Sequence, residues 1–285
     1  MRIIILGVNG MMGHKLFQVL KDNFNYEVIG TVRNKDYLNY FEEKSRIINI
    51  EIKSETQIDR LFKLYKPDMV INCIGVTKKF VKNVQQKIEM IEINSLLPHK
   101  LLSVAEKYNI RLIHISTDCV FSGSKGNYSE TDNPDPLDIY GKSKVLGEFS
   151  CTKNLVIRTS IIGPELNTKR GLLEWFLSQK DECKGFEKAI FSGLTTLELS
   201  KVIGKYIVPR KDLTGLINIS SNPISKLDLL KLIKKVYLKK IKISISNDLK
   251  IDRSLNSKKF YSLSKYICPH WEILIKDMYI DKRVG

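Results

Sequence analysis

The sequence has no long hydrophobic run, although hydrophobic residues make up 43% of its 285 residues. A membrane span needs roughly 18 or more consecutive apolar residues, and no segment comes near that length. The chain opens on the strand-like MRIIILG, without the basic, apolar and small-residue order of a signal peptide. We therefore expect a cytoplasmic protein with a well-packed core and no membrane span.

Cysteine and histidine are scarce and scattered along the chain. No CxxC pair and no Cys/His spacing typical of a metal site is present. Separated cysteines in an odd number indicate free thiols in a reducing compartment. The isolated histidines favour structural roles over metal binding, so no metal site is predicted. The residues concerned are Cys73, Cys119, Cys151, Cys183 and Cys268, with His14, His99, His114 and His270.

Acidic residues are too few to balance the basic ones. The chain has 31 Asp and Glu against 47 Lys and Arg, a formal net charge of +16. The lysines are spread along the chain, which favours a solvated basic surface. Such a surface can also steer an anionic nucleotide toward a site. No nucleic-acid-binding motif is present, so we expect no nucleic-acid partner.

The first two-thirds of the chain alternates short apolar runs with longer amphipathic stretches, which is typical of βαβ units and a parallel sheet. Predicted strands cover residues 2–6, 26–32, 46–52, 69–74, 112–116 and 155–159. Predicted helices cover residues 13–21, 57–65 and 87–108, and a further helix carries Tyr140 and Lys144. Pro98 should bend or break the long helix. The predicted fold class is α/β, a Rossmann-type doubly wound parallel sheet.

After about Gly163 this rhythm changes. Predicted helices over residues 172–179, 196–207 and 226–237 are separated by short strand-like pieces such as residues 216–220. We interpret this part as a substrate-facing cap built onto the sheet. The predicted division is a Rossmann domain over residues 1–163 and a smaller substrate-binding portion over residues 164–285, with a soft boundary and some exchange of chain.

A glycine-rich segment, GVNGMMG from Gly7 to Gly13, separates the first predicted strand from the first helix. Its GxxGxxG spacing is one residue longer in the first gap than GxGxxG, but the physics is shared. Glycines permit the tight turn, the approach of backbone N–H groups to a pyrophosphate and close packing of helix on strand. The helix N-terminus adds the positive end of its dipole. We predict a dinucleotide cofactor at this loop.

The end of the second strand indicates which dinucleotide binds. An acidic residue there would hold the adenosine ribose hydroxyls of NAD, whereas a basic residue suits the extra phosphate of NADP. The chain has Arg33 at this point, followed by Asn34 and Lys35. We predict NADPH as the cofactor, with NADH as the alternative, and an exposed structural arginine as the other interpretation of Arg33.

Tyr140 and Lys144 lie four residues apart and therefore on one face of a helix. An unperturbed tyrosine has a pKa of about 10 and is a poor acid or base near neutrality. A lysine ammonium one turn away is expected to stabilise the phenolate and lower that pKa. Ser116-Thr117-Asp118 ends the fifth predicted strand, where a hydroxyl can align a substrate carbonyl with the tyrosine.

These groups converge because ligands bind at the carboxyl ends of parallel strands. The glycine loop, Arg33, residues 72–75 and residues 116–118 all follow predicted strands. Trp175 is a further candidate, as an aromatic surface on which a nucleotide base could stack in the cleft. The convergence indicates an oxidoreductase better than any single motif does.

With these residues in place, the chain resembles the extended short-chain dehydrogenase/reductases, and within them the dTDP-4-dehydrorhamnose reductase family. The resemblance rests on GVNGMMG, PDMVINCIG, EINSLLPHKLL, HISTDCVFSG, DIYGKSKVLGE and VIRTSIIGPE. FSGLTTLELSKVI, ISKLDLLKLI and DRSLNSKKF are similar to the family's C-terminal, substrate-side segments. The resemblance thus covers nearly the whole chain.

The resemblance implies a role for each matching position. Tyr140 would donate the proton, Lys144 would activate it and anchor the ribose, Thr117 would orient the carbonyl, and Asn94 would complete the proton relay. Asp118 and Arg253 would contact the sugar nucleotide, with a structural salt bridge as the alternative for Arg253. The remaining positions would hold the cofactor: Gly7, Asn9, Gly10, Met11, Met12 and Gly13 at the pyrophosphate, Glu51 and Ile52 beside adenine, and Cys73, Ile74 and Gly75 along the groove.

One departure from the wider family bears on the reaction. The 4,6-dehydratases carry an acidic residue directly after the Thr-Asp pair, and this chain has Cys119 there. A thiol cannot replace that acid–base group in water elimination, so simple ketone reduction is favoured. The predicted function is NADPH-dependent reduction of the 4-keto group of a dTDP- or UDP-linked 4-keto-6-deoxy sugar, for cell-surface polysaccharide biosynthesis.

Two other functions stay open. One is a nucleotide-sugar epimerase that retains its cofactor. The other is a non-catalytic NADP-binding subunit, since relatives such as the methionine adenosyltransferase regulatory subunit act through partners. The resemblance also implies a homodimer through the long helices near Lys87 and Tyr140.

Overall fold

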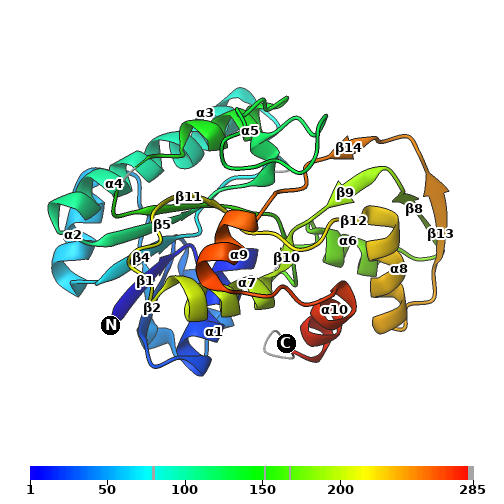
Figure 1. Ribbon diagram of the computed structural model, residues 1–285. Coiled ribbons are helices and arrows are strands. Elements are labelled where there is room, and N and C mark those ends of the chain that lie inside the picture. Colours follow the sequence, from blue (N-terminus) through cyan, green and yellow to red (C-terminus); the bar gives the residue numbers. More distant parts are fainter. Residues whose placement is uncertain (79–80, 151, 167, 282–285) are drawn as a thin grey trace.

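A parallel sheet of seven strands forms the centre of the molecule (Figure 1). The computed structural model describes residues 1–285 except 79–80, 151, 167 and 282–285, so Cys151 lies outside the described residues. The strands of this sheet are β1 (Arg2–Leu6), β2 (Glu27–Val32), β3 (Ile47–Asn49), β4 (Met69–Asn72), β5 (Arg111–Ile115), β6 (Leu155–Arg158) and β11 (Gly215–Asn218). Their order across the sheet is β11-β6-β5-β4-β1-β2-β3. The predicted Rossmann-type fold class is confirmed.

Helices cover both faces of this sheet (Figure 1). They are α1 (Met11–Asn23), α2 (Glu55–Tyr65), α3 (Val84–Ile91), α4 (Leu97–Lys107), α5 (Ile139–Leu146) and α7 (Thr196–Val202). Side chains alternate along each strand, so Ile3 and Ile5 pack on the side of α1 and α7, whereas Ile4 and Leu6 pack on the side of α2 and α4. Burial on both faces explains why these strands are continuous apolar runs.

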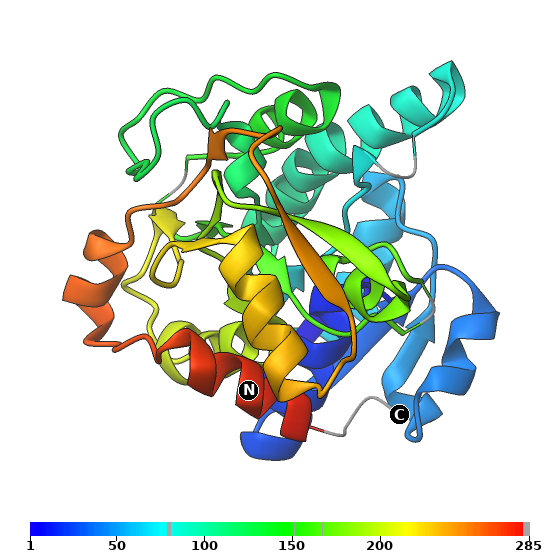
Figure 2. The same ribbon diagram turned by 90° about the vertical axis from the view of Figure 1, so that its right-hand side faces the viewer.

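A smaller part of the molecule, built from elements that follow β6 in the chain, lies beside the main sheet. Its strands are β7 (Ile161–Ile162), β8 (Glu182–Phe186), β9 (Ala189–Phe191), β10 (Leu194–Thr195), β12 (Ile224–Ser225), β13 (Lys242–Ser246) and β14 (Ile251–Asp252). Its helices are α6 (Leu172–Ser178), α8 (Lys226–Val236), α9 (Lys258–Ser264) and α10 (Trp271–Ile280). Figure 2 shows α8 packed against the paired strands β8 and β13.

The chain passes back and forth between the two parts. β11 comes from the segment after residue 163, yet it pairs with β6 and forms the edge of the main sheet. α7 comes from the same segment and packs against α1. The predicted cap therefore contains less than the whole of residues 164–285, and the division at residue 163 stays a prediction.

The predicted long helix is continuous but irregular. α3 and α4 are joined by a π-helical turn, η4 (Glu92–Leu96). Pro98 falls in the first turn of α4, where its missing N–H breaks no hydrogen bond within α4. The expected bend therefore takes the form of a π-turn just before the proline, and such turns are frequent at functional sites.

Other boundaries move by a few residues. The predicted strand over residues 46–52 shortens to β3, because residues 50–54 leave the sheet to enter α2. None of the helices in the described part of the chain has the length and apolarity that a bilayer crossing requires.

A buried ion pair joins the two ends of the chain. Lys15 Nζ of α1 lies 2.9 Å from Asp281 Oδ2, just after α10, and the two side chains are 1% and 8% exposed. A buried charge left without its partner is costly, because the protein interior solvates it poorly. The pair therefore holds α10 against the Rossmann domain.

Replacing Asp281 with Ala should lower the free energy of unfolding by about 3 kcal/mol, because the Lys15 ammonium would stay buried. Urea denaturation measures the loss. The matched control is Asp248→Ala, which breaks the Lys184–Asp248 pair, whose side chains are 65% and 67% exposed. That control should cost under about 1 kcal/mol. Equal losses in the two variants would show that burial of the Lys15–Asp281 pair does not increase its contribution to the free energy of unfolding.

Candidate active site

The candidate site lies along the carboxyl edge of the sheet, at the point where strand order reverses. β1 has β4 on one side and β2 on the other, and the connections on either side leave in opposite directions. Such a switch point leaves room for a ligand outside the strand ends. The glycine loop follows β1, Arg33 follows β2, Cys73 follows β4 and Thr117 follows β5.

The glycine loop is shaped for close approach of a ligand to the backbone. Gly7 has a φ of +80°, and a Cβ there would lie 2.9 Å from Ile74 Cγ1. A Cβ on Gly13 would lie 2.2 Å from the Gly7 carbonyl oxygen, so α1 starts against the loop only because residue 13 is glycine. Gly10 begins α1 without a side-chain cap. The first N–H groups of α1 are thereby left for an anion such as a pyrophosphate.

The residues predicted to contact the adenosine half lie at the outer end of the sheet. Arg33 is exposed, and its Nη1 lies 3.0 Å from Glu89 Oε1. Glu51 is exposed and paired with Lys53 at 2.8 Å, whereas Ile52 is buried. A cofactor phosphate at Arg33 would share the guanidinium with Glu89 or displace it.

Asn94 connects the cofactor groove to α5. Its fully buried amide accepts a hydrogen bond from Val76 N–H (2.9 Å) and donates to Val76 O (2.8 Å) and to Ser143 Oγ (3.0 Å). The loop after Cys73 and Ile74 is thereby held beside the helix that carries Tyr140. Gly75 is exposed on this loop, and a Cβ there would lie 3.5 Å from Asn94 Oδ1.

Thr117 and Tyr140 come together at the end of β5. The Thr117 hydroxyl caps the short helix η5 (Asp118–Val120) by accepting from Cys119 N–H at 3.2 Å, and it donates to Asp118 Oδ1 at 3.2 Å. Burial raises the pKa of Tyr140, the proximity of Cys119 raises it further, and a hydrogen bond with Thr117 lowers it. Burial also raises the pKa of Asp118. Tyr140 therefore holds its proton at neutral pH.

The expected lowering of the Tyr140 pKa by Lys144 was wrong. Lys144 Nζ donates to the Ile115 carbonyl oxygen at 2.8 Å and lies 3.4 Å from His114 Nε2. Burial lowers the pKa of Lys144 to about 8, while Glu148 and Cys73 raise it. Desolvation outweighs the attraction between the two groups, so a neutral phenol lies one helical turn from a lysine that titrates near neutrality.

Two glycines let α5 lie against the strand ends. A Cβ on Gly141 would lie 2.2 Å from the Cys119 carbonyl oxygen, and a Cβ on Gly147 would lie 2.0 Å from the Asn94 carbonyl oxygen. Ser143, between them, donates to the Tyr140 carbonyl oxygen at 2.8 Å and accepts from Asn94. The spacing of Gly, Ser and Lys after Tyr140 is therefore a packing requirement as well as a chemical one.

The predicted substrate residues differ in what they contact. Arg253, just after β14, donates from Nε to the Phe121 carbonyl oxygen at 2.8 Å, and its Nη1 lies 3.5 Å from Cys119 Sγ. Among the described residues Arg253 makes no salt bridge within 4.0 Å, although its charge acts on the pKa of Asp118, and both interpretations of Arg253 stay predictions. Trp175 is partly buried and packs against the main hydrophobic core. Its helix, α6, begins at Gly171 against Met11 of the glycine loop.

Sequence reasoning missed a charged network behind the site. Arg158 at the end of β6 binds Glu148 with Nε (2.9 Å) and Nη2 (2.7 Å), and Ser116 Oγ donates to the same carboxylate at 2.6 Å. The two charged side chains are 3% and 11% exposed. No local pattern predicted a buried charge here, because Arg158 ends β6, Glu148 follows α5 and Ser116 follows β5.

Lys226 was also missed. It is the first residue of α8, and burial lowers its pKa, while the nearby charges of Asp118 and Cys119 raise it. A cation from the smaller part therefore faces the strand-end residues. Only the tertiary fold brings residue 226 to residue 118.

The thiols and histidines at this edge do not form a nucleophilic or metal centre. Burial raises the pKa of Cys73 and of Cys119 to about 12, so both are neutral thiols. Among the described residues, no group of three or more His, Cys, Asp or Glu side chains is placed to hold a metal ion.

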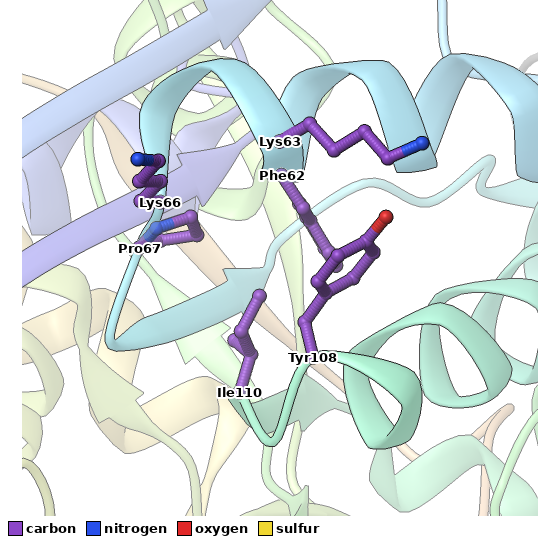
Figure 3. Close-up of a pocket in the computed structure, with 6 residues that line it drawn as sticks. All are labelled: Phe62, Lys63, Lys66, Pro67, Tyr108 and Ile110. Atoms are coloured by element: carbon purple, nitrogen blue, oxygen red, sulfur yellow. The ribbon is translucent and has the colours of Figure 1, made fainter.

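A separate pocket of about 320 Å³ lies at the amino ends of β4 and β5, the edge opposite the candidate site (Figure 3). Its lining residues come from the ends of α2 and α4 and from the turns that enter the two strands: Phe62, Lys63, Lys66, Pro67, Tyr108 and Ile110. None of the predicted site residues borders it.

Fold and site together define a Rossmann-fold protein with the side-chain arrangement of a short-chain dehydrogenase/reductase. The model of the RmlD substrate binding domain family matches residues 1–182, so the chain belongs to that family. The predicted resemblance to dTDP-4-dehydrorhamnose reductases is confirmed at the level of the family.

The curated relatives of the chain carry different names. The chain is 31% identical over 165 residues to dTDP-4-dehydrorhamnose reductase of Aggregatibacter actinomycetemcomitans, covering 56% of this chain and 51% of that protein. It is 27% identical over 153 residues to methionine adenosyltransferase 2 subunit beta of Xenopus laevis, covering 54% and 43%. The chain thus spans about half the length of the curated relatives it matches.

Solved structures share the fold over the whole chain. A dTDP-4-dehydrorhamnose reductase from Bacillus anthracis, in complex with NADP, superposes with a TM-score of 0.80 at 21% identity, covering 98% of this chain and 99% of that one. A UDP-glucose 4-epimerase from Thermotoga maritima, with UDP-glucose, also gives 0.80 at 18% identity and covers 100% of both. At these identities the likeness shows the fold alone.

Gly141→Ala should lower turnover by about tenfold or more and destabilise the protein by about 1–3 kcal/mol, because the added methyl group would push α5 away from the Cys119 carbonyl. Steady-state assays and urea denaturation measure the two effects. Lys142→Ala, on the exposed side of the same helix, is the matched control and should behave like the wild type. Full activity in Gly141→Ala would contradict the close packing.

Proposed function

We propose that this chain is an NADPH-dependent oxidoreductase that reduces the 4-keto group of a dTDP- or UDP-linked 4-keto-6-deoxy sugar for cell-surface polysaccharide biosynthesis. The observation that carries the proposal is the meeting of the Tyr140 phenol, the Thr117 hydroxyl and Lys144 at the carboxyl edge of the sheet, next to the glycine loop. A proton donor and a hydroxyl beside a dinucleotide cradle are what carbonyl reduction requires.

The residues at the glycine loop fit a dinucleotide. A Cβ at Gly7 would collide with Ile74, and a Cβ at Gly13 would push α1 away from the loop. The uncapped start of α1 offers N–H groups to phosphate oxygens. Gly7, Gly10 and Met11 would hold the pyrophosphate, and Lys144 would bind the nicotinamide ribose. When bound, NADPH would supply the hydride for the substrate carbon.

The chain's own groups supply the rest of the chemistry. Thr117 and Tyr140 would hold the carbonyl oxygen by hydrogen bonds, which aligns the carbonyl carbon with the cofactor. The Tyr140 phenol, neutral because burial raises its pKa, would give its proton to the oxygen as negative charge develops. Cys119 has no acidic proton near neutrality, which favours reduction over water elimination.

A nucleotide sugar suits the charges that face the site. Arg253 and Lys226 approach Asp118 from the smaller part, so an anionic ligand would be attracted between the two parts of the chain. Reductases of the same family from other organisms support this substrate class, among them a probable glycan biosynthesis reductase of Haloferax volcanii. We propose a cytoplasmic location, since the four described cysteines are free.

Tyr140→Phe should reduce turnover on the order of a thousandfold, because the proton donor is lost while the ring is kept. The measurement is the decay of NADPH absorbance with a panel of dTDP- and UDP-4-keto-6-deoxy sugars. Binding of NADPH, followed by fluorescence, should survive the change. Turnover retained by Tyr140→Phe would refute the assigned proton donor.

The same panel separates the two rival functions. An epimerase would contain tightly bound oxidised cofactor after purification and would interconvert sugars without net NADPH consumption. A regulatory subunit, as the methionine adenosyltransferase relatives suggest, would bind NADPH and reduce no sugar. Oxidation of NADPH that requires one of the sugars would support the reductase function and neither of the two rivals.

We also propose that Arg33 selects NADPH over NADH through the extra phosphate. Arg33→Ala should raise the KM for NADPH at least about tenfold and leave that for NADH unchanged, because a charge-assisted hydrogen bond is lost. Glu89→Ala is the matched control, since it frees the Arg33 guanidinium from its ion pair and should not weaken NADPH binding. An unchanged ratio of the two KM values in Arg33→Ala would overturn this assignment.

The homodimer stays a prediction. Val84, Ile88 and Ile91 lie on one face of α3 and are exposed, and Leu137 and Leu146 are exposed at either end of α5. This apolar surface lies on the helices that the resemblance pairs between two copies.

A further inference from the structure

A buried polar chain runs from the loop at the cofactor groove to Lys144. Asn72, the last residue of β4, accepts a hydrogen bond on Oδ1 from Ile74 N–H at 3.1 Å. Its Nδ2 lies 3.0 Å from His114 Nδ1, and His114 Nε2 lies 3.4 Å from Lys144 Nζ. Asn72 and His114 are fully buried, and Lys144 is 4% exposed. The imidazole was predicted to have only a structural role, and this contact gives it a chemical one.

The hydrogen bonds determine which ring nitrogen of His114 carries the proton. Only the amide oxygen of Asn72 can accept from Ile74 N–H, so the amide NH₂ must point at His114 Nδ1. Nδ1 therefore accepts, and a neutral imidazole has its proton on Nε2, facing Lys144. Burial holds the pKa of His114 well below its usual value, and the charges of Lys144 and His99 lower it further, so the ring is neutral.

An imidazole N–H in this position treats the two forms of Lys144 differently. It opposes the ammonium, because two donors face each other, and it donates to the lone pair of the neutral amine. The Ile115 carbonyl accepts from the lysine in both forms. The other charged or titratable groups that face Lys144 are Glu148 in the segment after α5, which pairs with Arg158, and the thiol of Cys73 after β4.

We propose that His114 is a positioning residue that holds Lys144 ready to release a proton, with Asn72 fixing the imidazole nitrogen that faces the lysine. This inference rests on the proposed reduction. When the substrate oxygen has taken the phenol proton, an N–H bond of the Lys144 ammonium breaks and the O–H bond of Tyr140 forms again. The amine left behind accepts a hydrogen bond from His114 Nε2–H until solvent protonates it.

The pH dependence of turnover follows from this arrangement. The ammonium form of Lys144 is present below its pKa of about 8 and is lost above it, so turnover should fall on the alkaline side. Asn72→Leu removes the donor to Nδ1 and lets the proton of His114 move there, so Nε2 would accept from the ammonium. The alkaline midpoint should then rise by about one pH unit.

Two further variants test the cause of that rise. Asn72→Asp should move the alkaline midpoint in the same direction, because a carboxylate accepts a hydrogen bond from Nδ1–H of His114. If the midpoint shifted in Asn72→Asp and not in Asn72→Leu, the shift would be a simple effect of the added charge, and the proposal would be overturned. His114→Gln should keep the wild-type midpoint, since an amide can accept from Asn72 and donate to Lys144. If Asn72 and His114 had a purely structural role, Asn72→Leu would lower kcat at every pH and leave the alkaline midpoint in place.

Nuclear magnetic resonance of ¹⁵N-histidine-labelled protein gives a readout that needs no turnover. The chain has four histidines, and His114→Gln assigns the signal of interest. The expected result is the Nε2–H tautomer in the wild type, the Nδ1–H tautomer in Asn72→Leu, and a change of the His114 Nε2 shift near pH 8 as Lys144 deprotonates. The Nδ1–H tautomer in the wild type would overturn the proposal. If these shifts appear and no sugar is reduced, the proposed function fails instead.

Discussion

The packing of α5 against the carboxyl edge of the sheet fixes the position of every proposed reacting group. Backbone carbonyl oxygens of Cys119 and Asn94 lie where side chains on Gly141 and Gly147 would otherwise stand. Such contacts between backbone atoms cannot relax as side chains can, so they set the height and rotation of the helix. Tyr140 is thereby placed within hydrogen-bonding distance of Thr117, and Lys144 is placed against the Ile115 carbonyl oxygen at the end of β5.

Burial then decides the charge of each group. Arg158 and Glu148 are buried as a pair with three hydrogen bonds between them, which offsets much of the cost of removing two charges from water. Lys144 is buried against a carbonyl and a neutral imidazole instead. Burial disfavours its ammonium and lowers its pKa to about 8, although Glu148 and Cys73 raise it. Lys144, the lysine proposed to move protons, thus differs from Arg158, whose charge is paired with a carboxylate.

The relatives of the chain include a dTDP-4-dehydrorhamnose reductase and a methionine adenosyltransferase 2 subunit beta, so the fold by itself does not decide the function. In this chain Tyr140, Thr117, Lys144 and Asn94 are all present at the carboxyl edge of the sheet. The cations Arg253 and Lys226 come from the smaller part. Chain crossing places them there, since β11 and α7 tie the segment after residue 163 to the sheet.

Local pattern predicted much of the architecture. The apolar runs of β1, β4 and β5 and the glycine loop are short-range signals, because a buried strand and a phosphate-binding turn each depend on a few adjacent residues. The π-turn before Pro98 was not predictable, since it arises from how Asn94 meets Val76 and Ser143. β11 was assigned to the cap because its four residues carry no sign of which sheet they join.

For this protein, the sequence by itself determined the order of strands and helices, the loop for a dinucleotide and the residue types of the site. These features depend on the spacing of residues along one helix or at the end of one strand, which the sequence contains directly. Only the tertiary structure decided the ionisation of these groups. The pKa values of Tyr140 and Lys144 depend on burial and on groups from other elements, such as Thr117 for Tyr140 and Cys73 for Lys144. Desolvation and hydrogen bonding act through space, so no local pattern contains them.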